Sequence, residues 1–175
     1  IVPGDPVLSD DITVRIATPS DLAAVDDLLS RSYPALLKHD YPPSVLVTIL
    51  PLISRANPAL LRSGSYFVAE IDGAVVGAGG WTPGSPVGLH GQKDLGHVRH
   101  VVTDHRRTRA GIGSALMARV FETAIARGMT GLEALSTRTA VPFYAALGFA
   151  AQGEVQVPLG PAGLPFAAER MLKRL

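Results

Sequence analysis

The chain gathers positive charge and glycines in one short stretch, and this combination suits the binding of a phosphate group. Residues 97–109 contain four Arg and three of the five His, and the sequence Ala110-Gly-Ile-Gly-Ser114 follows at once. Between a strand and a helix, such a stretch leaves free N–H groups at the helix start, where the helix dipole also favours an anion. Gly111 and Gly113 lack the Cβ atoms that would hold a phosphate away from that backbone. We therefore predict that this stretch binds an anionic ligand.

Simpler explanations of the same residues stay open. A Gly-x-Gly sequence at a helix start is often only a tight turn, and a cluster of Arg is often a solvated loop. Two other nucleotide-binding patterns do not fit, because a P-loop would place a Lys before Ser114 and a dinucleotide site would add a third Gly and a downstream acid.

The sequence offers little for metal or covalent chemistry. It has no Cys, which excludes a disulfide scaffold, a thiolate zinc site and a cysteine nucleophile. The His residues have no metal-binding spacing such as His-Glu-x-x-His, and no Ser lies in a Gly-x-Ser-x-Gly elbow. We predict no metal site and no covalent enzyme intermediate.

The composition indicates one domain over residues 1–175, with a loose tail expected at residues 1–11. The chain is 47% hydrophobic with a net charge of +1, so it is neither disordered nor surrounded by a strong field that would attract nucleic acid. No apolar run approaches the roughly 18 residues of a membrane span, and the first residues do not resemble a signal peptide. We expect a cytoplasmic protein without nucleic-acid or membrane partners.

The elements that must position these residues form a mixed α/β pattern. The strongest signals are the hairpin of residues 66–71 and 74–81 around Asp72-Gly73 and the amphipathic helix 111–127, which Gly128 ends. Strands are also expected at residues 13–17, 94–103, 132–137, 149–157 and 166–174, with a loop at 82–92.

Three further helices are expected from start and stop signals. One begins at residues 19–21 with Leu22, Val25, Leu28 and Leu29 on one face. A second covers residues 42–61, where Pro51 argues for a kink or break. Thr139 is expected to cap a short helix at residues 140–147.

Two segments resemble the motifs of the GNAT superfamily of N-acetyltransferases. Thr108-Arg-Ala-Gly-Ile-Gly113 is similar to motif A, written Gln/Arg-x-x-Gly-x-Gly/Ala, although Thr108 stands where the pattern prefers Gln or Arg. Residues 139–149, Thr-Ala-Val-Pro-Phe-Tyr-Ala-Ala-Leu-Gly-Phe, resemble motif B. The resemblance covers residues 13–174 and implies an α/β (α+β) fold. That fold has a mixed, mostly antiparallel sheet of six to seven strands, splayed at its centre and flanked by about four helices.

The resemblance also implies an enzyme that moves an acetyl group from acetyl-CoA to a primary amine by direct attack in a ternary complex. The pantetheine arm would pair with the backbone of Val101–Thr103, a backbone N–H near Val101 would stabilise the oxyanion, and the pyrophosphate would bind N–H groups of residues 109–114. The implied cofactor-binding residues are Val101, Val102, Thr103, Arg107, Thr108, Arg109, Ala110, Gly111, Ile112, Gly113, Ser114 and Thr139.

By the same resemblance, Tyr144 is the general acid that protonates the departing thiolate, with its pKa lowered by nearby positive charge. The alternative is that Tyr144 only packs. Some family members carry a catalytic Glu fourteen residues before the first motif-A Gly, and His97 occupies that position here. An imidazole suits a general base, directly or through water. His100, on the other strand face, and a water chain without a protein base are the alternatives.

The sequence does not choose the amine. Polyamines, aminoglycosides, amino acids and protein amines all fit the motifs. Residues 31–62 and 81–93 are expected to face the acceptor. A non-catalytic acyl-CoA sensor and a nucleic-acid module using residues 97–109 are the rival functions, and the 158–165 loop with Leu159 and Leu164 is a candidate homodimer contact. The acceptor-side candidates are Tyr33, Asp40, Tyr41, Trp81 and His90.

Overall fold

The computed structural model describes residues 11–83 and 93–175. The predicted tail, apart from residue 11, lies outside the described residues, as do His90 and most of the predicted 82–92 loop. The described chain forms one seven-stranded sheet in the order β1-β2-β3-β4-β5-β7-β6. The strands are β1 Thr13–Ile16, β2 Tyr66–Ile71, β3 Ala74–Thr82, β4 Leu95–Thr103, β5 Gly131–Ser136, β6 Ala150–Leu159 and β7 Leu164–Arg174.

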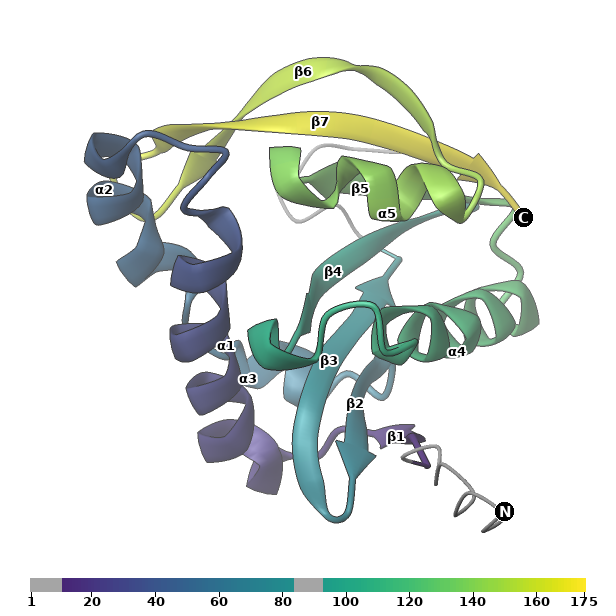
Figure 1. Cartoon of the computed structure of the whole chain (residues 1–175). Coiled ribbons are helices and arrows are strands. Elements are labelled where there is room, and N and C mark those ends of the chain that lie inside the picture. The colour runs from purple at the N-terminus through teal and green to yellow at the C-terminus, as the bar shows by residue number, and fades with distance from the viewer. Residues whose placement is uncertain (1–10, 84–92) are drawn as a thin grey trace, which may run out of the picture.

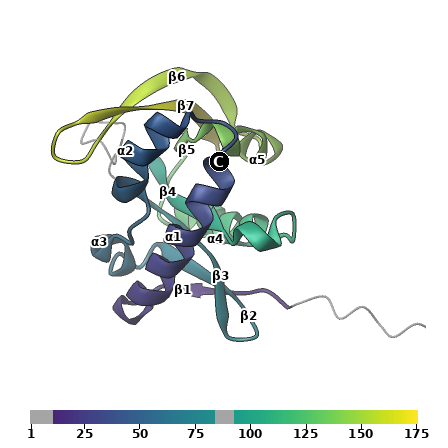
Figure 2. The same cartoon turned by 60° about the vertical axis from the view of Figure 1, so that its left-hand side comes forward.

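The sheet is antiparallel except where β4 pairs with β5 in parallel. This confirms the predicted mixed, mostly antiparallel sheet. A parallel pair needs a crossover connection, and α4 (Ile112–Ala126) supplies it. The helices α1 (Leu22–Leu37) and α2 (Pro43–Ile53) lie on one side of the sheet and α4 on the other (Figure 1). In the turned view α1 crosses in front of the central strands (Figure 2).

Two apolar layers hold these helices to the sheet. The predicted stripe of α4, Ile112, Leu116, Val120 and Ala124, is entirely buried. On the other face, Val25, Leu28 and Leu29 of α1 are buried, whereas Leu22 is exposed. Each fully buried large apolar side chain contributes about 1.5–3 kcal/mol relative to exposure, so these stripes fix both helices on the strands between them. A third cluster packs α2 against Phe166 of β7.

The predicted helix over residues 42–61 is two helices. Pro51 lies inside α2, which ends at Ile53, and α3 (Pro58–Leu61) begins after a break. Asn57 caps α3 by accepting a hydrogen bond from the Ala59 N–H at 2.9 Å. The break occurs because a capped start with Pro at the first helical position opens a new helix. The fold therefore has five α-helices in the described residues, where about four were expected.

The last short helix is α5 (Val141–Ala146), which follows a 3₁₀ turn at residues 138–140. Thr139 was expected to cap it, and this was wrong. The Thr137 hydroxyl accepts from the Ala140 N–H at 3.2 Å, while the Thr139 hydroxyl donates to Asp40 Oδ2 at 2.6 Å. The 3₁₀ turn moves the capping position two residues earlier in the chain.

Candidate active site

The two central strands separate part of the way along the sheet. β4 and β5 share only three residue pairs, the last being His97 with Glu133. Beyond that point, among the described residues, β4 pairs only with β3 and β5 only with β7. The predicted splay is therefore present, and it leaves one backbone edge of β4, from Val98 to Thr103, without a strand partner in the described part of the chain. Such an edge can add an extended ligand as a strand.

A bulge in β4 lies beside the point of separation. Between Ala78 and Gly80 of β3, the partners on β4 advance from Val102 to Arg99, which is one residue more than β3 provides. His100 lies within this step with φ of 45°. A bulge bends its strand and re-aims the neighbouring side chains, so the bend directs the end of β4 away from β5.

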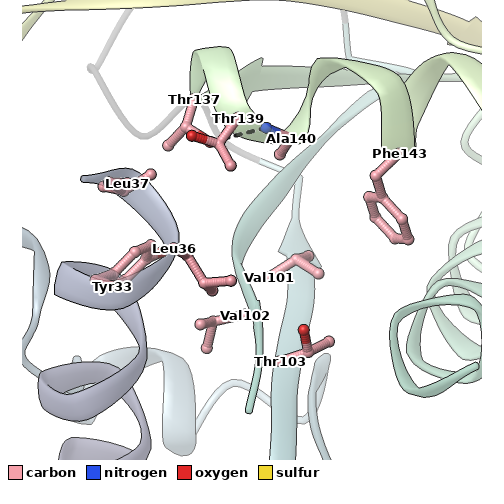
Figure 3. A pocket seen from close by; sticks show the side chains of 10 residues that line it. All are labelled: Tyr33, Leu36, Leu37, Val101, Val102, Thr103, Thr137, Thr139, Ala140 and Phe143. Carbon is pink, nitrogen blue, oxygen red and sulfur yellow. Dashed lines mark hydrogen bonds between the residues drawn. The ribbon is translucent and has the colours of Figure 1, made fainter. Parts of the chain in front are cut away.

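An apolar cavity of about 200 Å³ lies at the wedge. Val101, Val102 and Thr103 line it from β4, while Thr139 and Ala140 line it from the 3₁₀ turn before α5 and Phe143 from α5 itself (Figure 3). The opposite wall is α1, with Tyr33, Leu36 and Leu37 (Figure 3). The structure thus brings together the predicted residues Val101, Val102, Thr103 and Thr139.

The predicted anion site is the exposed turn before α4. Arg107, Thr108, Arg109, Ala110, Gly111 and Ser114 are all exposed, whereas Ile112 and Gly113 are buried. Gly111 is the N-cap of α4 with φ of 83° and contributes no side-chain cap. Within the part of the chain that the structure describes, nothing accepts from the first N–H groups of α4. A Cβ at Gly111 would meet only Ile12 Cδ1, at 4.0 Å, so the space before this helix start is open to an anion.

Gly113 is needed for a different reason from the one expected. A Cβ there would lie 2.8 Å from Cε2 of Phe143, so the ring of α5 fills the space that was assigned to phosphate. Phe143 also lines the wedge cavity. The close approach of α5 to α4 therefore joins the turn and the cavity into one surface.

Asp104 anchors the turn to α1. Its buried carboxylate accepts from the Arg106 backbone N–H at 3.0 Å and from the Arg106 guanidinium, and it lies 2.8 Å from Arg31 of α1. These cations hold the pKa of Asp104 well below its usual range. The turn residues that follow β4 are therefore positioned by a charged contact with the helix that walls the cavity.

Tyr144 is buried beside the wedge, and its pKa shift opposes the prediction. Its ring makes edge contacts with Phe143 and Phe149, with ring centroids 5.1 and 5.2 Å away. Burial raises the pKa of Tyr144, with a smaller contribution from the Tyr33 phenol. The expected lowering by positive charge is absent because the surroundings are apolar and aromatic. The phenol is therefore protonated at neutral pH.

The two candidate bases differ in position. His97 is buried, and its Nδ1 lies 3.3 Å from Glu133 Oε1, at the last residue pair before β4 and β5 separate. It lines neither the wedge cavity nor a second cavity, which Tyr33 and Arg99 line. His100 lines the second cavity. Burial, followed by the charge of Arg99, lowers the pKa of His100 to about 4, so this imidazole is neutral at pH 7.

A second cavity, of about 250 Å³, lies on the other side of the wedge. Tyr33 of α1 and Thr137 after β5 line both cavities, so the two meet there. Ile53 of α2 and the β6–β7 hairpin complete the wall of the second cavity. We name it the acceptor-side cavity.

Of the acceptor-side candidates, only Tyr33 lines this cavity among the described residues. Tyr41 is buried and donates to the Ala167 carbonyl, and Trp81 is a core residue that donates to Thr123. Asp40 accepts from Thr139, and His90 lies outside the described residues.

Sequence reasoning grouped Arg99 with the arginines of the turn, and the structure separates them. Arg99 lines the acceptor-side cavity, while Arg106 pairs with Asp104. The predicted strand boundary is the signal that could have separated them, because Arg99 lies within the expected strand 94–103 and Arg106 after it. Thr137 was also missed, because its place where the cavities meet depends on packing between distant elements.

Within residues 11–83 and 93–175, no group of three or more His, Asp or Glu gathers as a metal-binding set. In the same ranges, no helix has both the length and the apolar character needed to cross a membrane.

The sequence of residues 22–149 matches the model of the acetyltransferase (GNAT) family. The chain belongs to this family, and it is an acetyltransferase. No curated protein sequence matches the chain closely enough to count as a relative.

Solved structures share the fold. A GCN5-related N-acetyltransferase from Rhodopseudomonas palustris is 22% identical, with a TM-score of 0.74 over 93% of this chain and 95% of that one. The PaiA N-acetyltransferase from Thermoplasma acidophilum, solved with coenzyme A, is 13% identical, with a TM-score of 0.69 over 94% and 99%. N-acetylglutamate synthase from Neisseria gonorrhoeae, solved with coenzyme A and N-acetylglutamate, is 17% identical, with a TM-score of 0.60 over 94% and 35%.

Proposed function

We propose that the protein transfers an acetyl group from acetyl-CoA to a primary amine by direct attack in a ternary complex. The observation that carries the proposal is the joining, through Phe143, of the apolar wedge cavity to the open helix start of α4. An apolar channel ending at free N–H groups suits a ligand with a long uncharged arm and a pyrophosphate.

The chain's own groups suit the parts of this substrate. The unpaired edge at Val101, Val102 and Thr103 would bind the pantetheine arm as an added strand, and Thr139 would contact it from α5. The turn from Arg107 to Ser114 would bind the pyrophosphate, with Thr108 standing in for the usual Gln or Arg. A backbone N–H near Val101 would stabilise the oxyanion that forms when the amine attacks the thioester carbon.

Proton transfer would use one acid and one base. Tyr144 would donate its proton to the departing thiolate, and its raised pKa keeps it in the acid form. His97 would take the proton from the attacking ammonium through water, because its side chain does not line either cavity. Its contact with Glu133 offers a second explanation, a tie between β4 and β5. Replacement of His97 by Gln distinguishes a general base from a structural contact.

The first experiment measures the melting temperature with and without acetyl-CoA at two salt concentrations. A ligand at a hundred times its Kd adds about 2.7 kcal/mol and raises the melting temperature by several degrees. Release of free CoA thiol on addition of amines then tests turnover. A folded protein that acetyl-CoA does not stabilise would contradict the proposal. Stabilisation without turnover on any amine would favour the acyl-CoA sensor.

A further inference from the structure

The acceptor-side cavity contains a cation that has no carboxylate partner among the described residues. Arg99 points into it from β4, and the one hydrogen bond of its guanidinium among the described residues runs from Nη1 to Thr82 Oγ1 at 3.2 Å. Burial lowers the pKa of Arg99. The other N–H groups of this guanidinium have no acceptor among the described residues, so they are available to a ligand in the cavity.

Other partly buried arginines are satisfied differently. Arg15 lies 2.7 Å from both Asp21 and Glu70, and Arg170 lies 2.7 Å from Glu133. The fold thus neutralises its strand arginines with carboxylates where it can. Among the partly buried strand arginines that the structure describes, Arg99 is the one without a carboxylate, and it lines the cavity that meets the wedge cavity at Tyr33 and Thr137.

The rest of the described lining of this cavity is mostly apolar. Its described lining has no Asp or Glu, and its polar side chains besides Arg99 are Tyr33, His100 and Thr137. His100 is neutral at pH 7. A cationic polyamine would find no counter-charge on this wall. The apolar part is formed by Ile53, Val98, Leu135, Val157, Leu159 and Phe166.

We infer that the acceptor is a free amino acid with an apolar side chain, whose carboxylate pairs with Arg99. A guanidinium matches a carboxylate with two parallel hydrogen bonds. The amine would lie where the cavities meet, near Tyr33 and Thr137, and the apolar side chain would lie against the β6–β7 hairpin. The volume of about 250 Å³ suits a small molecule rather than a folded protein surface. This inference rests on the proposed acetyl transfer and names its substrate class.

The test compares acceptors that differ only in the carboxylate. Rates of CoA release are measured with L-phenylalanine against phenethylamine, and with L-leucine against isopentylamine. We expect kcat/KM for each amino acid to exceed that for its amine by about tenfold or more, because only the amino acid has a carboxylate that can pair with Arg99. A kcat/KM for an amine that equals the kcat/KM for its amino acid would overturn the inference.

Variants link this preference to Arg99. Arg99→Gln should raise KM for the amino acids by about tenfold or more and leave the amines nearly unchanged, whereas Arg99→Lys should recover part of the loss. Arg127→Gln is the matched control, because Arg127 lies over the Trp81 ring at the far end of α4 and its loss changes the net charge equally. A loss in Arg99→Gln that is equal for amines and amino acids would also overturn the inference.

The outcome separates this inference from the proposed function. Acetyl-CoA stabilisation is measured in each variant, and a wild-type protein that acetyl-CoA does not stabilise would refute acetyl transfer itself. Stabilisation together with turnover on cationic amines only would leave the proposed function in place and refute the carboxylate site. With CoA bound, N-acetyl-L-phenylalanine should also raise the melting temperature of the wild type more than that of Arg99→Gln, a readout that needs no turnover.

Discussion

The ring of Phe143 on α5 occupies the space where a side chain on Gly113 would lie, with the Cβ position 2.8 Å from the ring carbon Cε2. Gly113 belongs to the glycine turn and Phe143 to the short helix that follows β5. The two motifs of the family are thus in direct contact. The anion turn and the wall of the wedge cavity keep their relative position through this one packing contact.

A methyl group at Gly113 should therefore push the two motifs apart. We expect Gly113→Ala to destabilise the protein by about 1–3 kcal/mol, the usual cost of overpacking, and to weaken acetyl-CoA binding. The measurements are urea unfolding and calorimetric titration. Adding Phe143→Leu should recover much of the stability, since it removes the ring that the new Cβ meets. Effects of the two changes that simply add would show that this contact is not the cause.

Substitution of Ser114 tests the anion site without damaging the helix. Ser114 is exposed at the third position of α4. An Asp at this position favours the helix dipole and should raise or maintain stability, by up to about 1 kcal/mol. The same charge should repel the pyrophosphate and weaken acetyl-CoA binding by about tenfold or more. Ser114→Ala should change neither quantity appreciably, and an unaltered Kd in Ser114→Asp would remove the pyrophosphate from this turn.

Removal of the Tyr144 hydroxyl tests the proposed acid. Tyr144→Phe should lower kcat by about 10²–10⁴ and leave acetyl-CoA affinity nearly unchanged, because only proton donation is lost. Burial raises the pKa of this phenol, so the wild-type rate should show no fall from its ionisation up to pH 9. Tyr41→Phe is the control, since that hydroxyl bonds Ala167 instead. Wild-type turnover in Tyr144→Phe would leave Tyr144 as a packing residue.

His97→Gln separates a base from a structural tie. If His97 is the base, replacing it should lower kcat/KM at neutral pH by at least about tenfold and leave the melting temperature near that of the wild type. The exposed His39, changed to Gln, is the matched control. A normal kcat/KM together with a lower melting temperature would instead assign His97 to the contact with Glu133 that joins β4 to β5.

Local signals explain which parts of the fold were predictable. The Asp72-Gly73 hairpin follows from turn chemistry, because both residues have positive φ, 50° and 77°. The α4 stripe follows from periodicity. The pairing of Thr137 with Ala140 instead of a Thr139 cap was not predictable, since either hydroxyl fits the pattern.

The site depends more on tertiary geometry. The bulge in β4 and the positive φ of His100 could not be predicted, because no glycine marks that position in the sequence. Arg99 appeared to belong with Arg106 in one basic stretch, but Arg99 lies in β4 and lines the acceptor-side cavity, whereas Arg106 lies in the turn after β4. The direction of the Tyr144 pKa shift could not be predicted either, because it depends on the aromatic rings that surround the phenol.

Because His100 is neutral in the folded chain, the free energy of unfolding should depend on pH between about 6.5 and 4. The pKa of His100 is about 4 in the folded chain against an ordinary value of 6.5, so below pH 6.5 the unfolded chain binds a proton that the folded chain does not. The contribution of His100 to the free energy of unfolding is therefore fully present above pH 6.5 and is lost as the pH falls toward 4. The loss is at most about 3 kcal/mol.

Urea unfolding of the wild type and of His100→Gln between pH 7.5 and pH 4.5 measures this contribution of His100 to the free energy of unfolding. We expect the free energy of unfolding to fall with pH more steeply in the wild type, because the variant has no imidazole to protonate. Asp21 and Asp104 also have pKa values below their usual range, but their contribution is lost only as the pH falls below about 4 and is common to both proteins. Parallel pH curves would show that His100 is solvated and ionises freely. The acceptor-side cavity would then hold a cation beside Arg99 under mildly acidic conditions, and binding of a carboxylate there would strengthen as the pH falls.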